Sequence, residues 1–317
     1  MNSTLRQWTV TACGLLLTLL APAAWGKGCI APFVLPTEAA LSSAANQTQD
    51  RGFLWKISKG GKHSYLYGTM HLGRLEWWSP GPRMLAAIHD SRVIALEMDL
   101  SNSATAAKLM QGMRLKEGDL RPAPELTARL RLQAQAECLD WEPLKGLKTE
   151  FQLSTVLVAA ARRQQLESAF GVETMLTAFA HHQEKPVHAL ETVEEQLSAL
   201  RASSQSELTD IVKSSLDDLE SGAGTRVLLK LATAWAASDA ATLQSYEKWC
   251  ECVETPAERA MLKRVLDDRN QAIAARLDEL HGKSAPVFGA VGALHMFGSE
   301  GLPALLKARG YTVETVY

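Results

Sequence analysis

A short pattern, glycine followed three positions later by histidine, occurs near each end of this chain and directly follows an apolar segment both times. The first copy is Gly68–His71 after Tyr65–Tyr67, and the second is Gly292–His295 after Val287–Val291. Short apolar runs that end at glycine are typical of buried β-strands. Because ligands of open α/β sheets collect at the carboxyl ends of strands, the pattern predicts one shared site built from both ends of the chain.

Other segments extend the predicted sheet. Residues 53–59 and 63–68 flank Gly60-Gly61, which predicts a hairpin. The segment Arg92–Glu97 is nearly all apolar after its arginine, as expected for a strand buried on both faces. Further short strands are expected at 185–191, 286–291 and 311–316.

The middle of the chain, from residue 103 to 280, is expected to be predominantly helical and interrupted by the short strand at 185–191. Helices are expected near 103–114, 124–137, 148–166, 170–184, 192–219, 224–238, 239–251 and 255–281, with shorter ones ending at 90 and spanning 299–309. The predicted fold is α/β, with a central mixed sheet built from the N- and C-terminal segments and a large helical insertion.

The N-terminus has the layout of a secretory signal. Arg6 precedes an almost uncharged run from Val10 to Leu20, which is followed by small residues. The run is shorter than the ~20 residues of a membrane-spanning helix, so membrane contact is expected only through an uncleaved signal. The prediction is a periplasmic or secreted protein with a signal peptide at 1–26, a tail without periodicity at 27–50, and one α/β domain at 51–317.

Charge and cysteine content restrict the partners and the covalent framework. The formal net charge of −2 gives no reason to expect nucleic acid or an anionic membrane as a partner. Cys13 would leave with the signal, and the even number that remains predicts disulfides among Cys29, Cys138, Cys250 and Cys252. Cys250 and Cys252 are so close in sequence that we expect one or both to pair elsewhere. Metal binding by Cys-x-Cys is the alternative.

Four residues that can carry chemistry follow predicted strands: His71, Glu97, Glu191 and His295. Two imidazoles and two carboxylates from separate strand ends suit a divalent metal such as Mn, Co or Zn. Such a metal polarises a carbonyl and activates a water molecule, and a carboxylate outside its ligand set can move protons.

Structural roles are the alternative for each of these residues. A single histidine after a strand is more often a hydrogen-bonded loop residue than a ligand, but the duplicated motif favours function. Glu97, or Asp99 nearby, could cap the following turn; a carboxylate that ends an apolar strand is costly unless it is paired, which favours a role for Glu97. Glu191 could instead stabilise the helix that begins at Thr192.

Five motifs occur in a fixed order along the chain. They are Tyr-Leu-Tyr-Gly-Thr-Met-His-Leu-Gly (65–73), Ala-Leu-Glu-Met-Asp (95–99), Val-His-Ala-Leu-Glu-Thr-Val-Glu-Glu-Gln-Leu (187–197), Asp-Arg-Asn-Gln-Ala-Ile-Ala (268–274) and Val-Gly-Ala-Leu-His-Met-Phe-Gly (291–298). The ordered set resembles the TraB/PrgY/GumN family, which is related to the Tiki proteases, and the resemblance covers about 51–317.

This resemblance implies a metal-dependent peptidase that uses paired Gly-x-x-His motifs and an acidic residue. It implies metal roles for His71 and His295 and an acidic role for Glu97, with Glu191 a candidate. It also draws attention to Arg269, as a clamp for a substrate carboxylate or oxyanion, and to its neighbour Asn270. Glu173 stands where many relatives carry aspartate after glycine and an apolar residue, so its side chain reaches about one methylene further.

The resulting hypothesis is an exported metal-dependent hydrolase that acts on a peptide or protein substrate. The metal is held by His71, His295 and Glu97, and the catalytic residues are Glu97, Glu191 and Arg269. Because the resembling family is functionally mixed, two alternatives stay open. One is a non-catalytic protein that binds a peptide, haem or metal, and the other is a metal-free esterase with a histidine base.

Overall fold

The computed structural model describes residue 29, residues 33–46 and residues 48–317. The signal predicted at 1–26 therefore lies outside the described residues. In the described part of the chain, no helix combines the length and the apolar character needed to cross a bilayer.

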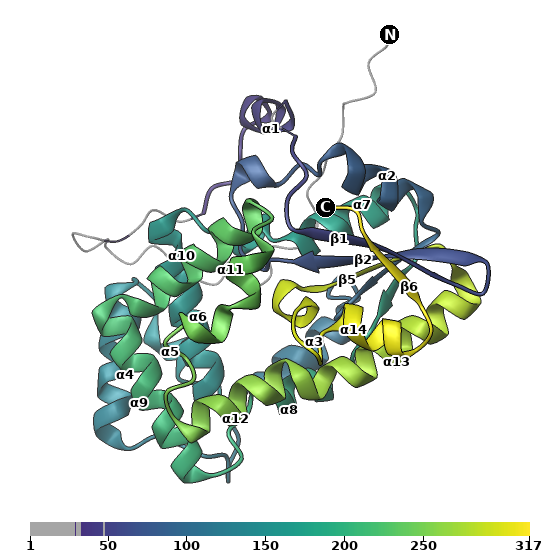
Figure 1. The fold of residues 1–317 in the computed structure, drawn as a ribbon. Helices are drawn as coiled ribbons and strands as arrows, with labels where there is room; N and C mark the ends of the chain where they lie inside the picture. Colours follow the sequence, from purple (N-terminus) through teal and green to yellow (C-terminus); the bar gives the residue numbers. More distant parts are fainter. Residues whose placement is uncertain (1–28, 30–32, 47) are drawn as a thin grey trace.

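Within the described residues, the sheet has six strands in the order β4-β3-β5-β2-β1-β6. They are β1 (Phe53–Lys59), β2 (Lys62–Thr69), β3 (Val93–Leu96), β4 (Val187–Ala189), β5 (Val287–Gly292) and β6 (Thr312–Thr315). β2, β5, β3 and β4 run parallel, whereas β1 pairs antiparallel with both β2 and β6. The mixed α/β sheet built from both ends of the chain is confirmed (Figure 1), and its parallel order brings four strand ends to one edge.

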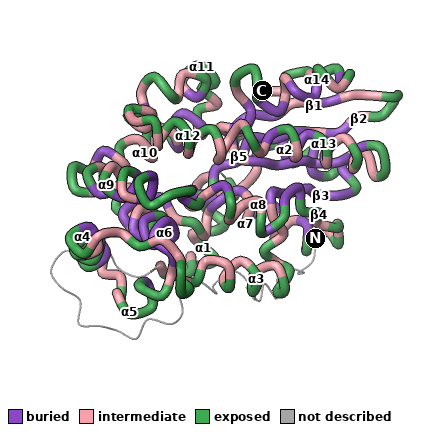
Figure 2. The backbone as a smooth tube through the Cα atoms, turned by 90° about the horizontal axis from the view of Figure 1, so that it is seen from below, coloured by how far each residue is buried: buried purple, intermediate pink, exposed green. Residues whose placement is uncertain are grey.

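Helices cover both faces of this sheet, because successive residues of a buried strand point to opposite sides. In β5, Phe288 packs in a core with α2 (Pro82–Asp90) and α7 (Val172–His182). Val287 packs on the other side with α13 (Asp267–Ser284) and α14 (Leu302–Ala308). Figure 2 shows buried residues along β3 and β5, and Figure 1 shows the sheet between α2 on one side and α13 on the other.

Apart from α7 and α13, which pack on the sheet, most of the helical insertion lies beside the sheet and has a hydrophobic core of its own, which includes Leu130, Val156 and Leu216 (Figure 1). Between β3 and β5 it contains α3 (Ser103–Met113), α4 (Pro124–Ala136), α5 (Trp141–Leu144), α6 (Thr149–Ala161), α7, α8 (Val193–Leu200), α9 (Gln205–Ser221), α10 (Ala223–Ala236), α11 (Ala240–Gln244), α12 (Pro256–Val265) and α13. Short 3₁₀ turns occur at Leu75–Trp77, Arg162–Gln164, Ser168–Phe170, Tyr246–Lys248 and Ala293–Met296.

Two long helices expected from the sequence are each interrupted. The helix expected at 192–219 ends at Leu200, and α9 begins after Ser204, whose hydroxyl accepts a hydrogen bond from the Glu207 amide. The helix expected at 255–281 is broken at Leu266 into α12 and α13. Apolar periodicity continues across both breaks, so the sequence pattern alone predicts one continuous helix in each case.

The N-terminal tail and the cysteines also differ from expectation. Residues 38–45 form a helix, α1, within the tail expected to be irregular. The disulfides join Cys29 to Cys138 and Cys250 to Cys252, so the expectation that Cys250 and Cys252 pair elsewhere was wrong. Glu251 adopts a left-handed backbone conformation (φ 55°), and the two flanking Cα atoms lie 5.0 Å apart, within the usual disulfide range.

Candidate functional site

The four residues expected at strand ends lie at the carboxyl edge of the parallel strands. His71 follows β2, Glu97 follows β3, Glu191 follows β4, and His295 lies in the 3₁₀ turn after β5. Backbone pairing continues past β3 and β4, because the Glu191 amide donates to the Glu97 carbonyl at 2.9 Å. The two carboxylate residues are therefore neighbours.

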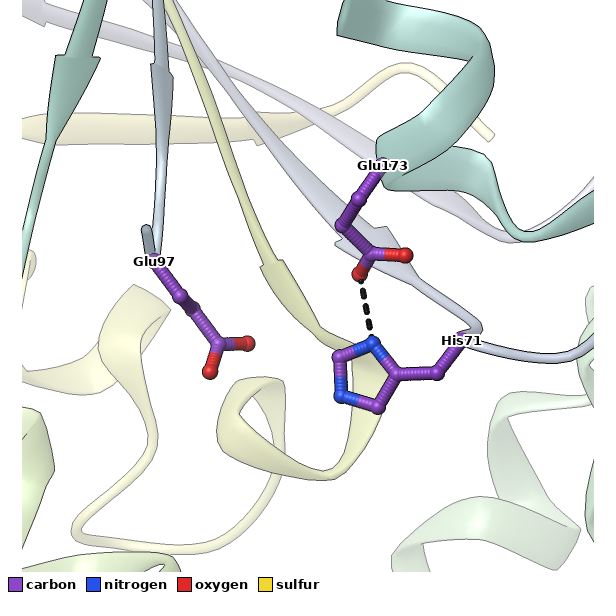
Figure 3. Close-up of side chains that lie close together, drawn as sticks. All are labelled: His71, Glu97 and Glu173. Atoms are coloured by element: carbon purple, nitrogen blue, oxygen red, sulfur yellow. Dashed lines mark ion pairs between the residues drawn. The ribbon is translucent and has the colours of Figure 1, made fainter. Parts of the chain in front are cut away.

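The side chains of three of these residues lie around Gly292. A Cβ atom at position 292 would lie 3.4 Å from Glu97 Oε1, 3.5 Å from His295 Cδ2 and 3.9 Å from His71 Nε2. We call this space, bounded by His71, Glu97 and His295 at Gly292, the Gly292 cradle. Figure 3 shows the Glu97 carboxylate and the His71 ring pointing toward one another.

Each histidine is oriented through its Nδ1 atom by an oxygen from a helix. His71 Nδ1 lies 2.9 Å from Glu173 Oε1 (Figure 3), and His295 Nδ1 lies 2.6 Å from Asn270 Oδ1. Asn270 donates its amide N–H to the Glu300 carbonyl at 2.8 Å, so its oxygen accepts and the His295 proton sits on Nδ1. Oxygen partners of this kind are typical behind metal-binding histidines.

Glu173 reaches His71 because two backbone segments approach closely. The Val172 amide donates to the Met70 carbonyl at 3.0 Å. A Cβ at Gly171 would stand only 2.4 Å from the His71 carbonyl oxygen, so glycine is required there. The Thr69 hydroxyl donates a second hydrogen bond to Glu173.

The two histidines of the site have pKa values shifted in opposite directions. The negative charge of Glu173 raises the pKa of His71 to about 9, whereas burial lowers the pKa of His295 to about 4. Burial opposes ionisation of Glu97, but the charges of His295, His71 and Arg269 lower its pKa well below the usual range. At neutral pH, His71 is therefore protonated, His295 is neutral and Glu97 is a carboxylate.

Arg269 joins the two strand-end carboxylates. Its Nη2 lies 2.5 Å from Glu97 Oε2 and also donates to Glu191 Oε2, while its Nε donates to Glu191 Oε1 at 2.8 Å. The Gln196 amide bridges the same carboxylates, at 2.8 Å from Glu97 and 2.9 Å from Glu191. The guanidinium expected to clamp a substrate is thus bonded to groups of the site itself.

The structure brings together all five residues that the sequence singled out and adds others. Glu173 and Asn270 were noted only through the resemblance, and Gln196 was not noted at all. Gly171 before α7 was the one local signal for a close approach near Glu173. The ligand atoms of His71, Glu97 and Glu173 all lie within 4.8 Å of one another, and His295 and Glu191 are not part of this close group. His295 Nε2 instead faces Arg269 Nη1 at 3.3 Å.

Comparison with known proteins gives a family match over almost the whole described chain. The model of the TraB/PrgY/gumN family matches residues 53–315. The uncharacterized protein YbaP of Shigella flexneri is 24% identical over 266 residues, which cover 78% of this chain and 89% of that protein. YbaP of Escherichia coli K12 shows the same identity and coverage. No solved structure matches the chain.

Proposed function

This chain belongs to the TraB/PrgY/gumN family, and from that premise we propose that it is an exported, metal-dependent hydrolase that cleaves peptide bonds. The observation that carries the proposal is the Gly292 cradle, where two imidazoles and a carboxylate from both ends of the chain face one space. The signal-like N-terminus and the disulfides support export.

The residues of the cradle fit a divalent cation. His71, His295 and Glu97 supply the nitrogen and oxygen donors that zinc, cobalt and manganese sites use. Both histidines are held at Nδ1, so Nε2 is the atom available as a ligand. Because His71 is protonated at neutral pH, it would release its Nε2 proton when a cation binds. We assign Glu173 to orient His71, because its Oε1 already accepts from His71 and from the Thr69 hydroxyl.

A bound cation would polarise the substrate carbonyl and lower the pKa of a water molecule. The protein supplies position and proton transfer. Arg269 and Gln196 hold Glu97 by its Oε2, and the Gly292 amide donates to its Oε1 at 2.7 Å. These bonds fix the carboxylate at the cradle.

In this proposal, Glu173 rather than Glu191 is the carboxylate outside the ligand set that accepts a proton. Glu191 has a side chain only 2% exposed, and both of its oxygens accept from Arg269. The Glu173 side chain is 24% exposed and lies on the His71 side of the cradle. Glu173 is therefore better placed to accept a proton from a water molecule, and Glu191 acts by positioning Arg269.

Metal content tests the proposed site. Wild type, His71→Ala and His295→Ala are loaded with Zn²⁺, Co²⁺ or Mn²⁺, desalted and analysed for bound metal. We expect about one ion per chain in wild type and a large loss in both variants, because each removes a ligand. His188→Ala is the matched control, since His188 is an exposed histidine on β4, and it should keep the metal. Full metal content in both site variants would contradict the proposal.

Peptide cleavage tests the reaction. A peptide library incubated with the loaded protein should yield products that a chelator suppresses. Capture of a peptide in equimolar amount without cleavage would favour the binding-protein alternative. Chelator-resistant ester cleavage that is lost in His71→Ala would favour the esterase.

A further inference from the structure

Arg269 uses every N–H of its guanidinium within the protein. An arginine side chain has five such donors. Nε and one N–H of Nη2 bind the two oxygens of Glu191, and the other N–H of Nη2 binds Glu97. Nη1 donates to the Val265 carbonyl at 2.8 Å and faces His295 Nε2 at 3.3 Å. No donor remains for a substrate.

The contact with His295 bears directly on metal binding. The His295 proton sits on Nδ1, where Asn270 accepts it, so Nε2 carries the single lone pair of the ring. That lone pair is the acceptor for Arg269 Nη1. It is also the only atom through which His295 can bind a metal, and it cannot serve both partners at once.

Arg269 and a metal cation would also compete as positive charges beside Glu97. Arg269 and Glu97 have side chains only 11% and 10% exposed, so the positive charge beside the carboxylate is poorly screened by water. The positive charge of the guanidinium balances the negative charges of Glu97 and Glu191 inside the protein. Its hydrogen bonds hold Glu97, Glu191 and His295 in place without a metal.

We propose that Arg269 is an internal counter-ion of the Gly292 cradle and competes with a divalent cation for His295 and Glu97. This inference rests on the metal site of the proposed function. To admit a cation, Arg269 Nη1 moves away from His295, while Nε and Nη2 stay on Glu191 as a two-bonded anchor. Arg269 is then a positioning residue that sets the metal affinity rather than a substrate clamp.

The test compares Zn²⁺ affinity by isothermal titration calorimetry in wild type and Arg269→Lys. Lysine keeps a positive charge near the carboxylates but has one nitrogen with three N–H donors in place of the planar fork with five, so it cannot replace all the bonds that Arg269 makes. We expect Zn²⁺ to bind Arg269→Lys about three- to tenfold more tightly, the size of one competing hydrogen bond. Arg276→Lys, on the same helix but bonded to Glu195, should bind Zn²⁺ like wild type.

Equal or weaker Zn²⁺ affinity in Arg269→Lys overturns the competition but leaves the metal site standing. Absence of Zn²⁺ binding in wild type and in both variants overturns the metal site and this inference with it. Circular dichroism shows whether Arg269→Lys folds. Wild type gives an independent result: in a Zn²⁺-bound crystal structure, Arg269 Nη1 should lie beyond hydrogen-bond distance from His295 Nε2. A retained contact with Zn²⁺ in the cradle overturns the inference.

Discussion

Gly68 and Gly292 are each the first residue of a Gly-x-x-His motif, but the two glycines have different roles. A Cβ at Gly68 would lie 3.2 Å from Ala293 Cα and 3.2 Å from Met296 Cγ, so this glycine lets the second motif pack against the first. Gly292 leaves space among the donor groups. Its φ of −45° is open to any residue, so space rather than a sharp turn is the reason for glycine there.

Substitution of Gly292 by alanine therefore separates folding from metal binding. The new methyl group would meet its neighbours at 3.4–3.9 Å, which is ordinary contact, so we expect the free energy of unfolding to change by less than about 1 kcal/mol. Zn²⁺ binding should be lost, because the methyl fills the cradle. Calorimetric titration and denaturant unfolding measure the two effects.

Gly68→Ala is the matched control for this experiment. It should lower the unfolding free energy, because its methyl group meets a backbone atom at 3.2 Å. Zn²⁺ affinity of wild-type strength in Gly292→Ala is the result that would disprove the cradle.

At the scale of elements, one capping residue links two helices near the site. Glu195 in α8 accepts from the Thr192 amide at 2.8 Å in a capping box. It also pairs with Arg276 of α13 at 2.6 Å, and the same arginine donates to the Leu190 carbonyl beside Glu191. These bonds hold the start of α8 against α13, the helix that carries Arg269.

This pair predicts part of the acid sensitivity of the fold. The hydrogen bond from Arg276 lowers the pKa of Glu195 to about 2, so its stabilising effect is complete above about pH 4.3, the ordinary glutamate value, and is lost as the pH falls toward 2. Glu195→Gln keeps the cap but loses the charge. At pH 7 its free energy of unfolding should be at most about 1 kcal/mol lower than that of wild type. This difference should disappear between about pH 4.3 and 2.

Denaturant unfolding as a function of pH measures this effect, and Glu117→Gln in an exposed turn is the control that should follow wild type. A gap between wild type and Glu195→Gln that stays constant down to pH 2 would contradict the assignment.

At the scale of the molecule, the two disulfides constrain very different lengths of chain. Cys29 and Cys138 are 109 residues apart, whereas Cys250 and Cys252 are separated by 2. Chain entropy predicts a stabilisation of about 4–5 kcal/mol for the long loop and about 1–2 kcal/mol for the short one. The double serine variant of the first pair should therefore unfold at clearly lower denaturant concentration than that of the second. Equal losses in denaturant unfolding would contradict this ranking.

Much of the architecture can be read from the sequence, because strands of a buried sheet have local signatures. The strands around Tyr67, Leu96 and Val291 are short apolar runs, each followed directly by a glycine or a glutamate, and the carboxyl ends of parallel strands lie at one edge of the sheet. That is why His71, Glu97, Glu191 and His295 could be expected together. The breaks at residues 201–204 and at Leu266 escaped prediction, since they depend on caps and packing rather than on periodicity.

By itself, the sequence determined the α/β class, the duplicated histidine motif and the edge of the sheet where the motif lies, because these follow from residue patterns only a few positions long. Tertiary structure decided the rest of the site. Arg269 lies 172 positions from Glu97 and 78 from Glu191, and Glu173 lies more than a hundred positions beyond His71. Contacts over such distances arise only when the packed helices bring these side chains together, so the bonded state of Arg269 and the partner of His71 could not be predicted from local pattern.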